Sequence, residues 1–106
     1  MRSLKIMRLY HSTDEACKQG IEKYGFYDSK VMDSRGFVWF CDGKDPDVPT
    51  MRTGWWISID LSDEIAAEYL YRLLDGQVYG TSPICYYRVP LDLTNSRKPF
   101  LFERWS

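Results

Sequence analysis

The chain has 106 residues and a formal net charge of -1, a size that fits one domain with one small hydrophobic core. Hydrophobic residues make up 44% of the chain and charged residues 27%, so the composition is not that of a disordered protein. The near-neutral charge argues against nucleic acid or an anionic membrane surface as a non-specific partner.

The three cysteines, Cys17, Cys41 and Cys85, lie far apart and form neither a metal-binding pair nor a disulfide framework. Reduced, buried thiols are typical of a cytoplasmic protein. Residues 1–12 contain no long apolar run, so neither a signal peptide nor a membrane span is expected. We therefore expect a cytoplasmic localisation and no membrane partner.

The first predicted elements are a strand and a helix. Residues 5–10 (KIMRLY) have the composition of a strand. Two pairs of side chains compete for its core face: Ile6 with Leu9, and Met7 with Tyr10. A helix is expected after Ser12, because its hydroxyl and the carboxylate of Glu15 fit a capping box. Gly25 is the expected end of this helix, since glycine accepts a left-handed backbone there.

The middle of the chain predicts two strands, a loop and a second helix. Residues 36–41 (GFVWFC) are typical of a buried strand, and residues 42–52 are rich in turn formers. Residues 54–61 (GWWISIDL) alternate between two faces, as a strand with one buried face does. Ser62 is the expected cap of a helix over residues 63–74.

Two more strands are expected near the end of the chain. Residues 84–89 (ICYYRV) form one, ended by Pro90, and residues 100–105 (FLFERW) form the other. The pattern predicts an α+β fold over residues 1–106, as one compact domain with a mixed or mainly antiparallel sheet and two helices.

Three short segments follow, in order and spacing, the pattern of a known superfamily. Residues 10–13 (YHST) end the first strand, Gly25 and Phe26 end the first helix, and residues 36–42 (GFVWFCD) form the second strand. These segments resemble small members of the ADP-ribosyltransferase-like superfamily. The resemblance implies the fold of that superfamily and NAD as the substrate, from which nicotinamide leaves as the glycosidic bond breaks.

The resemblance also implies roles for individual residues. His11 would hydrogen-bond a ribose hydroxyl, and the backbone at Ser12 would hold the nicotinamide amide. Trp39 would stack on the nicotinamide ring, so that His11 and Trp39 are the implied catalytic residues. Thr13 and Gly36 complete the implied cofactor-binding set with His11, Ser12 and Trp39.

The sequence departs from the superfamily at the catalytic glutamate. Residues 76–87 (GQVYGTSPICYY), where the glutamate is expected, contain no acidic residue. Gln77 can replace some hydrogen bonds but not the charge, and Glu103 is the remaining late glutamate. RNA 2′-phosphotransferases of the same superfamily work without that glutamate by binding phosphate through arginines. Three arginines are candidates for that role here: Arg35, Arg52 and Arg88.

Two functions of different classes stay open. The first is a protein that binds NAD or another nucleotide and transfers ADP-ribose to a protein or other macromolecular target. The second is a non-catalytic ligand-binding or protein-interaction module, which could be a homodimer that buries Trp55 or Trp56. For His11, the alternative to a ligand role is a hydrogen bond to a backbone carbonyl, and for Trp39 it is core packing.

Overall fold

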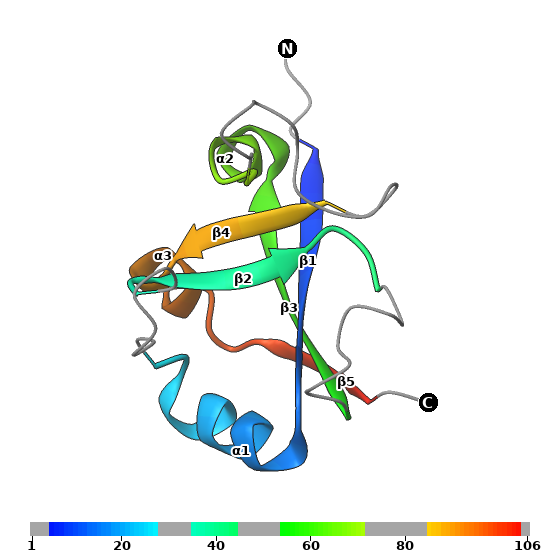
Figure 1. The fold of residues 1–106 in the computed structure, drawn as a ribbon, viewed down its shortest axis with the longest axis vertical. Coiled ribbons are helices and arrows are strands. Elements are labelled where there is room, and N and C mark those ends of the chain that lie inside the picture. Colours follow the sequence, from blue (N-terminus) through cyan, green and yellow to red (C-terminus); the bar gives the residue numbers. More distant parts are fainter. Residues whose placement is uncertain (1–4, 28–34, 45–53, 72–84, 105–106) are drawn as a thin grey trace.

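The structure, a computed structural model, describes residues 5–27, 35–44, 54–71 and 85–104. The described part of the chain forms a five-stranded sheet and three helices (Figure 1). The elements, in chain order, are β1 (Ile6–Thr13), α1 (Glu15–Tyr24), β2 (Phe37–Cys41), β3 (Trp55–Ser62), α2 (Asp63–Glu68), β4 (Tyr86–Pro90), α3 (Leu91–Asn95) and β5 (Leu101–Arg104).

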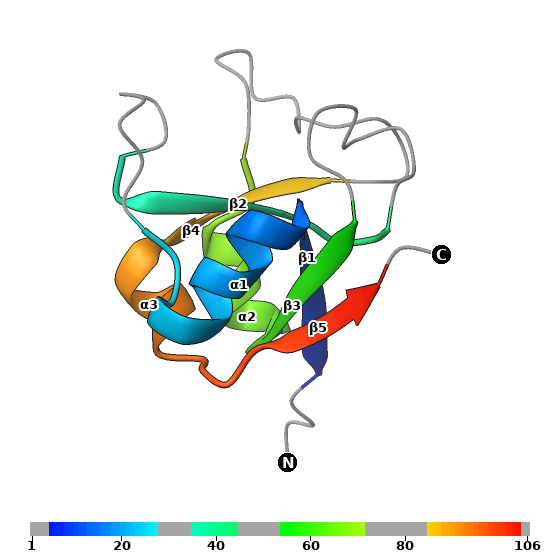
Figure 2. The ribbon, with the colours of Figure 1, turned by 90° about the horizontal axis from the view of Figure 1, so that it is seen from below.

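The strand order across the sheet is β4-β2-β1-β3-β5, and each pair of neighbours is antiparallel. This confirms the α+β class and the mainly antiparallel sheet. The strands β2 and β4 cross β1 at a steep angle, and Figure 2 shows the helices on the concave side of the bent sheet. Buried residues from the strands, α1 and α2 form one hydrophobic cluster under that side. No helix among the described residues has the length and apolar character needed to cross a membrane.

Strand β1 lies at the centre of the sheet and corrects the prediction for its core face. Leu9 is fully buried, whereas Ile6 is 65% exposed. Met7 packs against the same core as Leu9. Both predicted pairs were wrong, because residues three apart lie on opposite faces of a strand and only residues two apart share a face. His11 and Thr13 therefore point to the helix side with Leu9.

The start of α1 also differs from the prediction. Ser12 was the expected cap, but β1 continues through Thr13, which pairs with Trp55 of β3. Asp14 caps the helix instead, and its Oδ1 accepts a hydrogen bond of 2.8 Å from the backbone nitrogen of Cys17. The predicted end is confirmed, since Gly25 has a φ of 86° and donates its N–H to the Ile21 carbonyl.

The second predicted helix is shorter in the described residues than expected. Ser62 caps α2 as predicted, through a bond from the Ile65 nitrogen to its Oγ. The helix ends at Glu68, because the chain then turns and Leu70 forms a bridge with Tyr87 of β4. The rest of the predicted helix, residues 72–74, lies outside the described residues.

A third helix, α3, was not predicted, and it is hydrogen-bonded to the segment that follows α1. Its last residue, Asn95, accepts a hydrogen bond of 2.8 Å from the backbone nitrogen of Phe26. Its side-chain nitrogen donates to the Phe26 carbonyl at 3.0 Å. One amide thus satisfies both backbone groups of Phe26 and fixes the chain where it leaves α1.

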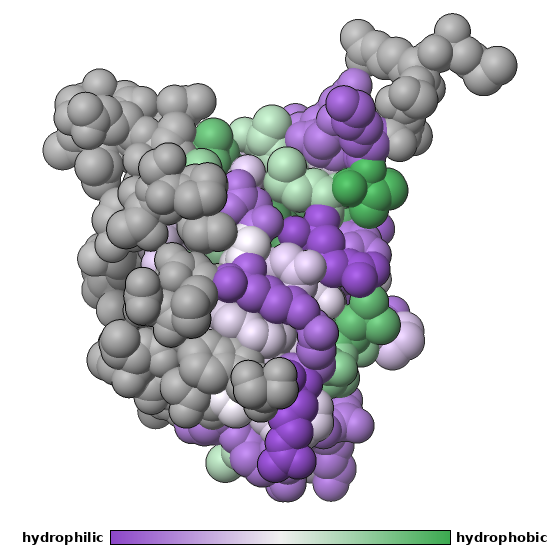
Figure 3. Space-filling view, turned by 90° about the vertical axis from the view of Figure 1, so that its right-hand side faces the viewer, coloured by the Kyte–Doolittle hydropathy of each residue, from purple (hydrophilic) through white to green (hydrophobic). Residues whose placement is uncertain are grey.

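The outer face of the sheet carries paired charges and is turned away from the helices. Arg8 and Asp60 lie opposite each other on β1 and β3 and form an ion pair of 2.8 Å. Lys44 pairs with Glu103 of β5. On the side of the molecule on which β5 ends, many of the described residues are hydrophilic, with a few apolar ones among them (Figure 3). The site described next is on the helix side.

Candidate functional site

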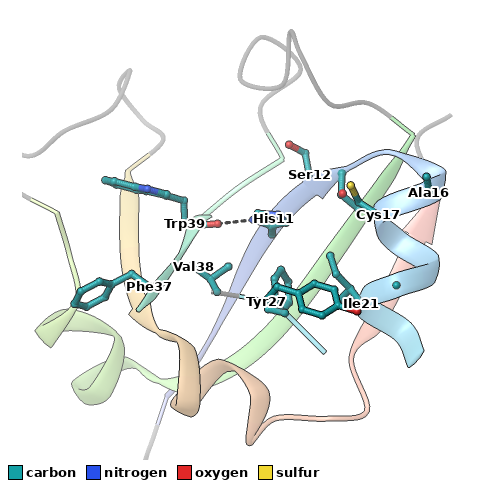
Figure 4. Close-up of a pocket in the computed structure, with 12 residues that line it drawn as sticks. His11, Ser12, Ala16, Cys17, Ile21, Tyr27, Phe37, Val38 and Trp39 are labelled. Carbon is teal, nitrogen blue, oxygen red and sulfur yellow. Dashed lines mark hydrogen bonds between the residues drawn. The ribbon is translucent and has the colours of Figure 1, made fainter. Parts of the chain in front are cut away.

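A cavity of about 640 Å³ opens between α1 and β2, at the end of β1 (Figure 4). Its walls come from residues 11–13, residues 26–27, residues 37–39 and one face of α1. The helix contributes Cys17 and Ile21, which are four residues apart and therefore share that face. Most of the lining is apolar, as is usual for sites that bind small molecules.

The cavity exists because β1 and β2 separate after a single paired position. Tyr10 is opposite Cys41, and no later residue of β1 is paired with β2. The side chain of His11 spans the opening, and its Nδ1 lies 2.7 Å from the carbonyl oxygen of Trp39 (Figure 4). A side chain thus replaces the backbone hydrogen bond that a continued strand pair would make.

The surroundings of His11 determine its charge and its tautomer. The ring edges meet Phe26 at 5.1 Å and Phe40 at 5.8 Å between ring centroids. Burial among these groups lowers the pKa of His11, and the bond to the Trp39 carbonyl opposes that change only in part. Because a carbonyl only accepts, Nδ1 carries the hydrogen, and Nε2 of the neutral ring is a hydrogen-bond acceptor. Among the described residues, none bonds this Nε2.

Ser12 and Thr13 line the cavity together with His11, as the predicted site requires. Gly36 does not, because it lies in the turn before β2 and is not among the described lining residues. Its φ is 80°, and its carbonyl accepts a hydrogen bond of 2.8 Å from the backbone nitrogen of Leu91. The role that the structure gives to Gly36 is to position the start of α3.

The indole of Trp39 lies on the opposite face of the sheet from the His11 ring. It contacts Tyr71 at 4.9 Å and Tyr86 at 6.4 Å between ring centroids, and the guanidinium of Arg88 is 5.7 Å away. Neighbouring residues of a strand point to opposite faces, and Phe40 is the one that points toward His11. The carbonyl of Trp39 therefore lies beside His11 while its indole is on the other side of the sheet, and the stacking role of Trp39 stays a prediction.

Of the other residues considered for phosphate or charge, Arg35, Arg88 and Glu103 are described, and none of them lines the cavity. Arg88 stacks on Phe37 at 4.2 Å on the outer face, and its buried Nε has no hydrogen-bond partner. Arg52 and Gln77 lie outside the described residues. Glu103 pairs with Lys44 on the outer face of the sheet.

Cys17 and Tyr27 are two of the cavity residues that were not among the predicted site residues. Cys17 lies on the cavity face of α1, and the helical spacing from Ile21 could have indicated this. Tyr27 lies at the mouth of the cavity and is 66% exposed. Its position depends on the turn at Gly25, and the sequence gives no direct signal for where the chain goes after such a turn.

No family model, curated protein or solved structure matches this chain, so the site is interpreted from its own geometry.

Proposed function

We propose that the protein binds NAD or a related nucleotide in the cavity, with a ribose hydroxyl donating a hydrogen bond to Nε2 of His11. The observation that carries the proposal is the bond of 2.7 Å between Nδ1 of His11 and the Trp39 carbonyl. This bond holds the ring in one orientation and leaves an acceptor nitrogen for a ligand. Because the pKa of His11 is lowered, the acceptor is present at neutral pH.

The dimensions and polarity of the cavity support a ligand of this class. Its volume of about 640 Å³ is within the usual range for small-molecule sites. The apolar wall from Ile21 and Val38 suits a flat ring, while Thr13, which points to the same side as His11, supplies a hydroxyl. A nucleoside has the same two parts, a flat ring joined to a hydroxylated sugar.

We further propose that the protein transfers ADP-ribose to a macromolecular target. This reaction needs a carboxylate in addition to the groups that bind NAD. The bond to nicotinamide breaks through a cation-like transition state, which a nearby carboxylate stabilises. None of the described residues that line the cavity carries a carboxylate. This observation favours binding without transfer as the second candidate, a non-catalytic module on the same fold.

A homodimer built on Trp55 or Trp56 has less support. Trp56 is only 6% exposed and meets Tyr10 edge-on at 6.2 Å. Trp55 donates its indole N–H to Glu15 and lies under the ammonium of Lys18. Both indoles already have contacts within one chain.

Proton NMR of NAD with and without the protein, followed over hours, tests the proposal. Broadened NAD lines are the expected result, and new signals of free nicotinamide would add glycosidic cleavage to binding. The variant His11→Asn keeps an amide nitrogen where Nδ1 lies, so that the Trp39 carbonyl keeps a donor, but it has no atom at Nε2. We expect it to weaken NAD binding by about tenfold, the effect of one lost hydrogen bond.

The circular dichroism of His11→Asn should match that of the parent, which separates a lost contact from a lost fold. Unbroadened NAD lines with the parent protein would refute nucleotide binding. Equal binding by parent and variant would remove His11 from the site.

A further inference from the structure

Tyr27 is a large aromatic residue that the proposed function has not used. It lines the cavity, yet its side chain is 66% exposed. We propose that Tyr27 stacks on the planar ring of the ligand and thereby selects ligands that carry an aromatic ring over sugar phosphates that lack one. This proposal rests on ligand binding beside His11 and names the part of the ligand that the cavity distinguishes.

The backbone that carries Tyr27 is fixed on both sides of the preceding residue. Gly25 turns the chain with a φ of 86°, and Asn95 hydrogen-bonds both the nitrogen and the carbonyl of Phe26. The ring of Phe26 is buried and meets His11 at 5.1 Å. Tyr27 therefore starts from an anchored position, directly after a residue that contacts the proposed ligand-binding histidine.

The ring of Tyr27 lies against the helix side of the cavity. A Cβ atom built on Gly20 would be 3.9 Å from Cε2 of this ring, so the ring rests over the helix where it has no side chain. Figure 4 shows Tyr27 next to Ile21, across the cavity from β2. A planar ring that enters between α1 and β2 would meet the face or edge of Tyr27 on one side.

The other aromatic residues of the cavity wall cannot take this role equally well. Phe26 is buried, Phe37 stacks on Arg88, and Trp39 directs its indole to the far side of the sheet. Tyr27 is the most exposed aromatic residue in the described part of the cavity wall. Tyrosine also suits a cavity mouth, because its ring offers an apolar face while its hydroxyl stays in water.

The test uses nicotinamide mononucleotide as the probe with a ring and ribose 5-phosphate as the probe without one. Dissociation constants and ligand proton shifts are measured by NMR for the parent, Tyr27→Phe, Tyr27→Ala and Tyr24→Ala. Tyr24 is the control for the ring beside Tyr27, because it is exposed, at 58%, lies 6.5 Å from the Tyr27 ring between centroids, and does not line the described cavity. Both tyrosines lie at the surface, so neither substitution should unfold the protein.

We expect Tyr27→Ala to weaken the binding of nicotinamide mononucleotide by about tenfold, as loss of one stacked ring does. The binding of ribose 5-phosphate should not change. The upfield shift of the nicotinamide protons should persist in Tyr27→Phe and in Tyr24→Ala. Unchanged binding of the mononucleotide by Tyr27→Ala would overturn the stacking role while the proposed function stands. Equal weakening of the binding of both probes would also overturn it, and a parent protein that binds neither these probes nor NAD would overturn the proposed function itself.

Discussion

His11 combines two properties that usually conflict, since it is partly buried and yet keeps a polar atom for a ligand. Its Nδ1 satisfies the Trp39 carbonyl at 2.7 Å, and phenyl rings rather than charges surround the imidazole. The folded protein therefore holds His11 neutral, with its pKa below the ordinary value. In the unfolded chain the same ring is in water and binds a proton more readily, so the two states differ in bound protons.

The first prediction concerns the titration of this residue. His11 is the one histidine of the chain, so its ring protons give the only histidine signals in an NMR spectrum. We expect a titration midpoint below 6.5, because burial outweighs the bond to the carbonyl. A midpoint at or above that value would contradict the buried, neutral state.

The same shift predicts how stability depends on pH. The unfolded chain binds more protons than the folded one between the lowered pKa and 6.5, so the free energy of unfolding should rise with pH across that window. Below the lowered pKa and above 6.5 the contribution of His11 should be constant. Urea unfolding at about pH 5 and about pH 7.5 measures the difference, and His11→Asn should reduce it. An identical pH dependence in parent and variant would show that other groups cause it.

The sequence could place His11 at the end of a strand but not its bonding partner. The strand composition of residues 5–10 and the helix signal after it are local, and both lie next to His11 in the chain. Which face Trp39 takes depends on the register between β1 and β2, which is set by the single pair Tyr10 and Cys41. A register between distant segments is a property of the folded sheet, so local patterns do not reveal it.

One glycine lies inside α1 and another directly follows it, and the space and backbone angles at the two positions differ. Gly25 ends the helix with a positive φ, and a Cβ there would lie 2.6 Å from Cε of Lys98. Gly20 lies inside the helix, where the nearest atom to an added Cβ is 3.9 Å away, an ordinary contact. The first glycine is needed for the turn toward Tyr27. The second makes the helix less stable than alanine would and lies under the Tyr27 ring.

Substitution of these glycines should therefore change stability in opposite directions. Gly25→Ala is expected to lower the free energy of unfolding by about 1–2 kcal/mol, because alanine is strained at positive φ. Gly20→Ala is expected to raise it by about 0.5–1 kcal/mol through helix propensity. Denaturant unfolding of the two variants measures both changes. Two changes of the same sign would contradict this account of the helix end.

At the scale of elements, the strands were predicted well, whereas the short helix α3 was not. The alternation in residues 54–61 identified β3, and its side chains at 57, 59 and 61 are buried together as expected. The prediction of one buried face was wrong, because Trp56 and Ser58 on the other face are also buried, at 6% and 8% exposed. The helix α3 has only five residues, which is too short to show a helical period. It forms because Pro90 ends β4 and the chain must turn, and its Thr94 bonds back to the Pro90 carbonyl at 3.0 Å.

The whole sheet is built by interleaving the two halves of the chain. β1 lies between β2 from its own half and β3 from the other, and β4 from the second half pairs with β2. β1 pairs with β3 along its whole length but with β2 at one position. The first half alone would therefore lose most of the partners of its central strand.

We accordingly predict that the full chain unfolds in one cooperative transition and that residues 1–53 do not fold alone. Urea denaturation followed by circular dichroism should give a single sigmoidal curve for the full chain and none for the fragment. A fragment with its own cooperative transition would divide the chain into two folding units and contradict the single domain.

The bond between His11 and a main-chain carbonyl also affects how the site tolerates mutation. Every amino acid at position 39 supplies the same carbonyl oxygen, so codon 39 can change without removing the acceptor that orients the imidazole. Codon 11 has no such freedom, because no other side chain provides both ring nitrogens. Related proteins could therefore keep this site without an aromatic residue at position 39, and a search pattern that requires one would not find them.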